Sequence, residues 1–405
     1  MPLRHQCAVY GIGLFATSMY HMSVTIVPLF VRDMALTPLM LGFVLGCRPI
    51  LPLFLSIHAG SLMDRIGGRR VMVFFALIGL ITPILYPVMP FVWAVIVLQL
   101  LSGLADSMGW LGAQTLVGQL MKGRTRYAGR LSFIIRIGHL VGPPMVGATW
   151  DLVGPWGAFS LISLWGFGVL ASALMIPALP ANSPESPTPP RERLGLRDLL
   201  PNPADYVSAF RLLAIPAVAI TVLIGMMTHV GNNIQSTFYV VWLDQIGISG
   251  TLIGVLVSIS AVGAALGSLV AAKLARYIRP YWLLWSTVFI ALMLIAITPL
   301  LGTYVLLAIV LSLRSTATGI HQPVVISLML RTAGSVSHGK AIGLRGTMNR
   351  ITSICAPMLM GAIAEVVGLE IAFYMIGGIS AFFMLWLGWR MKQLPEIHER
   401  GHDSA

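Results

Sequence analysis

Apolar residues form long runs along this chain, and short polar or basic segments separate them. A helix needs about 20 mostly apolar residues to cross the hydrocarbon core of a bilayer. The pattern predicts twelve such helices, over residues 8–31, 39–62, 71–89, 92–120, 131–153, 157–177, 214–242, 250–272, 281–300, 302–329, 343–366 and 370–390. The predicted fold class is therefore an all-α integral membrane protein with twelve transmembrane helices.

One long polar segment interrupts this pattern. Residues 177–206 are rich in proline, serine and charge, a composition that cannot bury a core. We expect a six-helix bundle over 1–180, a cytoplasmic linker over 181–211, and a second six-helix bundle with a short cytoplasmic tail over 212–405.

Composition and charge agree with a membrane protein. The chain is 57% hydrophobic and 10% charged, whereas soluble proteins carry about 25% charged residues. The net charge of +12 does not indicate nucleic-acid binding, because the basic residues lie mostly in short loops. Of the 26 Lys and Arg residues, four fall deep inside spans, Arg32 alone lies in an outer loop, and the other 21 lie in inner segments or at the inner ends of spans. This asymmetry predicts a multi-pass membrane protein with both termini cytoplasmic. We expect it to be a monomer in a bacterial inner membrane.

The two halves of the chain repeat each other. A shift of 214 residues aligns Arg136 with Arg350, Pro143 with Pro357, Gly147 with Gly361, Asp151 with Glu365 and Gly154 with Gly368, and a shift of 208 aligns Gln114 with Gln322. Parallel halves with a substrate site between them are one design of secondary transporters.

The loop GSLMDRIGGRR after the second span resembles the signature loop of the major facilitator superfamily, with matches at Gly60, Asp64, Arg65, Gly67 and Arg69. Gly68 stands where that motif has a basic residue. The resemblance covers essentially the whole chain and implies that family's fold of two six-helix halves that rock around a central site. It also implies that the loop is a conformational motif.

The fifth predicted span resembles a glycine motif of the export branch of that superfamily. Gly129, Gly138, Gly142, Pro143 and Gly147 match, and Val146 departs from the pattern. Small residues permit close helix packing, and Pro143 and Pro144 leave carbonyl groups unpaired. The resemblance implies export.

Five charged residues fall deep inside spans, where charge is costly and usually functional. They are Arg48, Asp106, Arg136, Arg314 and Arg350. Asp106 and Arg314 occupy equivalent positions in the repeat, so we expect them to face each other as an ion pair. Asp151 and Glu365, near the outer ends of their spans, are expected to be solvated or to cap a helix.

Further polar residues in the spans predict a wet central cavity. These candidates are Tyr20, His21, Gln114, His139, His229, Asn232, Asn233, Gln322, His321 and Asn349. The run THVGNNIQ at 228–235 suggests a broken helix.

The excess of arginine favours an anionic substrate, because guanidinium groups bind carboxylates in a bidentate fashion. We expect export of a small organic anion, such as a carboxylate-bearing metabolite or a siderophore-like compound, in exchange for protons. Asp106, His139 and His321 are the candidate proton carriers. A multidrug exporter and a proton-coupled anion importer fit the same features. No nucleotide-binding loop, metal-ligand spacing or hydrolase motif occurs, so no cofactor, metal or enzymatic activity is expected.

Overall fold

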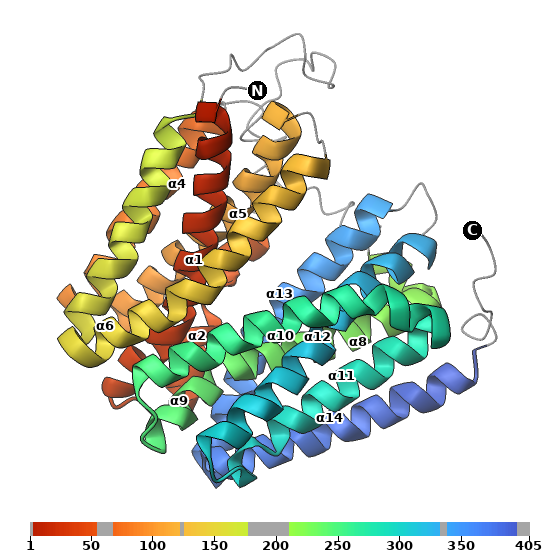
Figure 1. The fold of residues 1–405 in the computed structure, drawn as a ribbon. Helices are drawn as coiled ribbons and strands as arrows, with labels where there is room; N and C mark the ends of the chain where they lie inside the picture. Colours follow the sequence, from red (N-terminus) through yellow and green to blue (C-terminus); the bar gives the residue numbers. More distant parts are fainter. Residues whose placement is uncertain (1–2, 55–67, 122–124, 177–209, 333–337, 395–405) are drawn as a thin grey trace. The chain divides into compact units, whose positions relative to one another are not determined.

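The structure is a computed structural model, and it describes residues 3–54, 68–121, 125–176, 210–332 and 338–394. Helices make up nearly all of these residues, which contain no β-strand (Figure 1). The helices are α1 (Leu3–Asp33), α2 (Pro38–Gly46), α4 (Gly68–Val88), α5 (Val92–Met121), α6 (Thr125–Leu174), α8 (Pro216–Ser236), α9 (Phe238–Gln245), α10 (Gly250–Tyr277), α11 (Pro280–Ala296), α12 (Tyr304–Thr332), α13 (His338–Val367) and α14 (Leu369–Lys392). Two 3-10 helices complete the order, η2 (Arg211–Ala214) and η3 (Thr298–Leu300).

Each of the twelve predicted spans has a helical counterpart. Within the described residues, nine helices are long and apolar enough to cross a membrane, and shorter apolar helices cover Pro38–Phe54 and Pro280–Ala296. One of the nine, within α6, contains both the fifth and the sixth predicted spans. The backbone departs from helical geometry between them, at Gly154. The predicted linker at 181–211 and its division of the chain stay predictions, since 177–209 lie outside the described residues.

Gly154 and Gly368 show the repeat in the backbone itself. Both residues have φ in the left-handed region, +76° and +84°, which favours glycine. Gly154 separates the two parts of α6, and Gly368 separates α13 from α14. The same turn therefore ends the fifth and the eleventh predicted spans.

The chain forms two compact units. Of the described residues, the first unit comprises those within 1–36, 43–202 and 243–258, and the second comprises those within 37–42, 203–242 and 259–405. In the first unit, α1, α4, α5 and α6 pack around a core that includes Ile12, Phe75 and Leu116. In the second, α8 packs against α11, α12 and α13 around a core that includes Leu284 and Val325.

Glycines of the predicted export motif lie at close helix contacts within the first unit. A side chain at Gly138 would meet Ser18 and Leu14 of α1, and one at Gly142 would meet Met22. A Cβ at Gly147 would collide with the carbonyl oxygen of Gly250. These three positions therefore hold α6 against its neighbours, as the spacing predicted.

Pro144 frees a carbonyl group that another helix uses. Proline has no N–H, so the carbonyl of Leu140, four residues earlier, lacks its helical donor. The Ser258 hydroxyl of α10 donates to Leu140 O at 2.6 Å. The second proline of the sequence motif thus creates an acceptor for an interhelical bond.

Asp151 and Glu365, equivalent in the repeat, both cap helices. Asp151 Oδ1 accepts from Gly250 N–H at 2.8 Å, and Oδ2 accepts from Thr251 N–H at 2.7 Å, so the carboxylate caps α10. Glu365 Oε2 accepts from Leu39 N–H at 2.9 Å in the first turn of α2. A carboxylate at a helix N-terminus also interacts favourably with the helix dipole.

Candidate functional site

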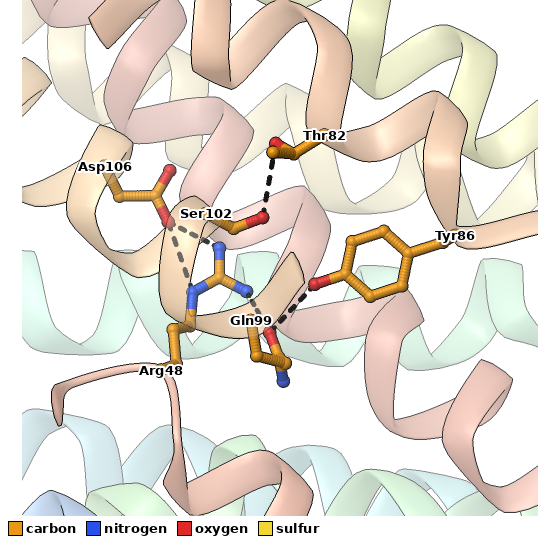
Figure 2. A network of polar contacts seen from close by, with 6 residues as sticks. All are labelled: Arg48, Thr82, Tyr86, Gln99, Ser102 and Asp106. Carbon is orange, nitrogen blue, oxygen red and sulfur yellow. Dashed lines mark hydrogen bonds and ion pairs between the residues drawn. The ribbon is translucent and has the colours of Figure 1, made fainter. Parts of the chain in front are cut away.

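A buried ion pair lies at the centre of the polar groups of the first unit. Arg48 Nη2 lies 2.5 Å from Asp106 Oδ2, and Arg48 Nε donates to the same oxygen at 3.2 Å. The side chains are only 11% and 7% exposed. Figure 2 shows the guanidinium of Arg48 turned toward Asp106 and Gln99. The structure thus gives Asp106 a cationic partner within its own unit, Arg48. The expected pair between Asp106 and Arg314 joins the two units and stays a prediction.

A break in the second predicted span puts Arg48 in this place. Residues 47–49 form a turn between α2 and the helical residues that begin at Ile50. The residue before a proline disfavours helical geometry, and here that residue is Arg48 itself, followed by Pro49. On the facing helix, a Cβ at Gly103 would collide with the Arg48 carbonyl oxygen. The absence of a side chain at Gly103 lets the two backbones meet.

The ion pair belongs to a larger network that runs along α5. Arg48 Nη1 donates to Gln99 Oε1 at 3.4 Å, and the Tyr86 hydroxyl donates to the same oxygen at 3.1 Å. Nearby, Ser102 Oγ donates to Thr82 Oγ1 at 3.3 Å (Figure 2). Gln99, Ser102 and Asp106 are spaced by three and four residues, so they share one face of α5. This spacing was the available sequence signal for Gln99, which the sequence analysis missed.

Tyr20 extends the network toward two histidines. The Arg48 Cζ lies 5.4 Å from the centre of the Tyr20 ring, a cation–π contact. The Tyr20 ring meets His21 edge-on at 5.2 Å, and the His21 and His139 rings lie 3.9 Å apart between centroids. Arg136, exposed on α6, precedes His139 by three residues. The first unit therefore brings together most of its sequence-predicted residues.

The second unit holds its own buried cation. Arg314 of α12 is 2% exposed; its Nη1 donates to Gln235 Oε1, and its Nη2 donates to Asn232 Oδ1 at 3.1 Å. Gln235 in turn donates to Ser260 Oγ at 3.1 Å. These two hydrogen-bond partners of the guanidinium are neutral amides, in contrast to the carboxylate beside Arg48.

The other candidates of the second unit have separate surroundings. Asn233 Nδ2 donates to the His229 carbonyl at 2.7 Å and to Ser353 Oγ at 3.0 Å, and Ser353 Oγ donates to the Asn349 carbonyl at 2.9 Å. His321 is buried, and Arg350 is half-buried. Gln322 is exposed, as is its counterpart Gln114 on α5.

The structure corrects the prediction for the polar run 228–235 and describes only part of the signature loop. The polar run 228–235 is not broken, because α8 continues to Ser236 and the irregular residue is Thr237, with φ −124° and ψ −90°. Of the signature loop, Gly60, Asp64, Arg65 and Gly67 lie outside the described residues, and Arg69 is half-buried in the first turn of α4.

Comparison with known proteins decides the family. The model of the Major Facilitator Superfamily matches residues 9–238 and again 221–403. The chain belongs to the major facilitator superfamily. It is therefore a multi-pass membrane transporter and not an enzyme, and its transported molecules and the bilayer are its partners.

Relatives in the same superfamily are named as exporters or resistance proteins. The chain is 22% identical over 406 residues to the multidrug resistance protein MdtG of Escherichia coli O6:K15:H31, covering 96% of this chain and 95% of that one. It is 26% identical over 316 residues to the enterobactin exporter EntS of Escherichia coli O1:K1, covering 75% and 72%.

Solved structures agree on the fold. A mutant form of the nucleoside transporter NupG has a TM-score of 0.79 at 15% identity, covering 95% of this chain and 99% of that one. A POT family transporter in complex with 5-aminolevulinic acid has a TM-score of 0.74 at 12% identity, covering 98% and 97%. These likenesses show that the major facilitator fold extends over nearly the whole chain.

Proposed function

We propose that this transporter exports a small organic anion in exchange for protons. The observation that carries the proposal is the charge balance of the buried arginines. Arg48 has a carboxylate partner in Asp106, whereas Arg314 is hydrogen-bonded to two neutral amides. A buried charge without a counter-charge is strongly disfavoured in a medium of low dielectric constant. An anionic substrate, such as a carboxylate-bearing metabolite or a siderophore-like compound, supplies that counter-charge.

The direction of transport rests on the export motif and on the relatives. Gly138, Gly142 and Gly147 lie at tight helix contacts, which is the packing role expected for that motif. The two relatives described above are named as an exporter and as a multidrug resistance protein. In this proposal the protein lies in a bacterial inner membrane with both termini and the linker in the cytoplasm, as its Lys and Arg distribution favours.

Coupling to protons is assigned to Asp106. Its Oδ2 is bound by Arg48, whereas its Oδ1 is buried and has no hydrogen-bond partner among the described residues. A proton on this carboxyl group removes its charge and weakens the ion pair, which frees Arg48 for an anion. His139 and His321 each have an unpartnered, buried Nε2 within the described part of the chain and are further proton acceptors.

Transport into proteoliposomes with an imposed pH gradient tests the function. We expect labelled citrate or benzoate to move against a proton flux and ethidium, a lipophilic cation, to move far less. Asp106→Asn abolishes the pH dependence, and Asp33→Asn serves as the matched control because the Asp33 side chain is 55% exposed. Transport of ethidium without transport of either anion would contradict the anion proposal and favour a multidrug exporter. Anion movement down the proton gradient, in the same direction as the protons, would indicate uptake instead.

A further inference from the structure

Four residues of α8 and α9 form a polar stripe in the second unit. Asn232 and Gln235 are three residues apart in α8, and Tyr239 and Trp242 are three residues apart in α9, so each pair shares a helical face. Thr237, between the two pairs, departs from helical geometry. The first pair binds the Arg314 guanidinium. The two rings of the second pair stack at 6.0 Å between centroids, and Tyr239 lies close enough to Arg314 to interact with it electrostatically.

Arg314 of α12 and the two aromatic residues of the stripe each hold a hydrogen-bond donor that lacks an acceptor among the described residues. Arg314 Nε, the Tyr239 hydroxyl and Trp242 Nε1 are buried and have no hydrogen-bond partner among the described residues. The three residues are only 2–3% exposed. Leaving a buried donor unpaired costs about 1–3 kcal/mol, more for a charged group.

Two half-buried indoles of this protein do find acceptors. Trp285 Nε1 donates to the Met384 carbonyl at 2.6 Å, and Trp165 Nε1 donates to Ser18 Oγ at 2.9 Å. The unpaired state of Trp242 is therefore not a general property of tryptophan in this chain. Two other buried donors, the Tyr239 hydroxyl and the positively charged Arg314 at Nε, are also unpaired among the described residues.

We propose that Arg314 Nε, the Tyr239 hydroxyl and Trp242 Nε1 together bind one small monovalent anionic group. Three donors with one positive charge match an acceptor that carries one negative charge, either a free halide or the carboxylate of a larger molecule. That the bound group is a carboxylate of the transported anion rests on the proposed function. The existence of the anion site does not rest on it. Tyr239 and Trp242 are then recognition residues that sequence analysis did not single out.

Thermal unfolding of the purified full-length protein in detergent tests the site. Sodium formate and sodium bromide are titrated separately at constant ionic strength against sodium methanesulfonate, a bulkier anion. A ligand that binds only the native state raises the midpoint temperature in a saturable manner. We expect this rise with formate and, if the site accepts free halides, also with bromide. Formate without bromide assigns the site to carboxylate groups.

Matched variants connect the effect to the three donors. Tyr239→Phe and Trp242→Phe each remove one donor and keep an aromatic ring, so the half-saturating concentration should rise about tenfold or more. Trp285→Phe is the control, because its indole already has an acceptor, and it should leave that concentration unchanged. Should Trp242→Phe fail to fold, Tyr239→Phe alone suffices.

Two outcomes would overturn the site. One is a wild-type protein whose unfolding responds to neither anion. The other is a response that Tyr239→Phe leaves intact. If the wild-type protein transports no anion in proteoliposomes but shows the expected formate titration, that result contradicts the proposed function and still supports the anion site.

Discussion

Arg48 and Asp106 meet inside the first unit, with 2.5 Å between Arg48 Nη2 and Asp106 Oδ2. The two residues lie 58 positions apart in the sequence, on a broken span and on α5. Because both side chains are nearly buried, each charge depends on the other. Removing one partner leaves an uncompensated charge, whereas removing both does not.

A single variant and a double variant separate stability from transport at this pair. Asp106→Asn should destabilise the protein by about 3–5 kcal/mol, because the Arg48 charge stays buried without its counter-charge. The combination of Arg48→Met with Asp106→Leu should recover most of that loss and yet remain inactive in proton-driven transport. Thermal unfolding and the proteoliposome assay measure the two effects. A double variant as unstable as Asp106→Asn would show that the two charges are not coupled.

Gly103 is predicted to be as necessary as the charges themselves. Gly103→Ala places a methyl group against the Arg48 carbonyl oxygen, so the backbones must separate and the ion pair must lengthen. We expect a loss of stability of about 1–3 kcal/mol, the usual range for overpacking, and a loss of coupled transport.

Gly225→Ala is the control for Gly103→Ala, since no atom beyond the neighbouring residues and the backbone of its own helix lies within 4 Å of a Cβ at Gly225. Alanine favours the helix over glycine by about 1 kcal/mol, so this variant should be neutral or stabilised. Equal unfolding midpoints for the two variants would refute the steric argument.

The link between Pro144 and Ser258 can be tested by a double-mutant cycle. Ser258→Ala removes the donor to Leu140 O and should cost about 1 kcal/mol, since the carbonyl has no helical donor. In a Pro144→Ala background the new N–H of residue 144 can bind that carbonyl, so Ser258→Ala should cost much less. The difference between the two free energies of unfolding is the measurement. Identical costs in both backgrounds would mean that the proline is not the reason for this bond.

The caps at Asp151 and Glu365 should contribute unequally. Asp151 accepts hydrogen bonds from two backbone N–H groups and from the Thr251 hydroxyl, whereas Glu365 accepts one from the Leu39 N–H group. Asp151→Ala should therefore cost about 1–2 kcal/mol, at the upper end for N-caps, and Glu365→Ala less. Hydrogen exchange of the amides of Gly250, Thr251 and Leu39 reports each cap separately. Faster exchange at Leu39 in Asp151→Ala would contradict the assignment of the caps.

Much of the fold could be predicted from local pattern. The runs of apolar residues locate the helices because a bilayer core requires unbroken apolar length. The repeat at a shift of 214 identifies Gly154 and Gly368, and the structure gives both a left-handed backbone at the same turn. Glycines at 138, 142 and 147 are recognisable as contact positions from their spacing, although the sequence does not say which helices they meet.

The site was harder to predict because its partners come from different helices. The repeat paired Asp106 with Arg314 by equivalence of position, but equivalence in a repeat says nothing about distance in space. Arg48 reaches Asp106 because a turn at 47–49 and the missing side chain of Gly103 allow a close approach. Neither condition is visible in the hydropathy of the second span.

The sequence by itself determined the membrane-embedded all-α class, the repeated halves and the residues that carry charge into the bilayer, because each depends on composition or on spacing along one chain. Only the tertiary structure decided that Arg48 is neutralised by Asp106 while Arg314 is bound by Asn232 and Gln235. It also decided that Tyr239 and Trp242 hold unpaired donors. Hydrogen bonds and ion pairs act over about 3 Å, so only the packing of one helix against another decides which polar groups meet.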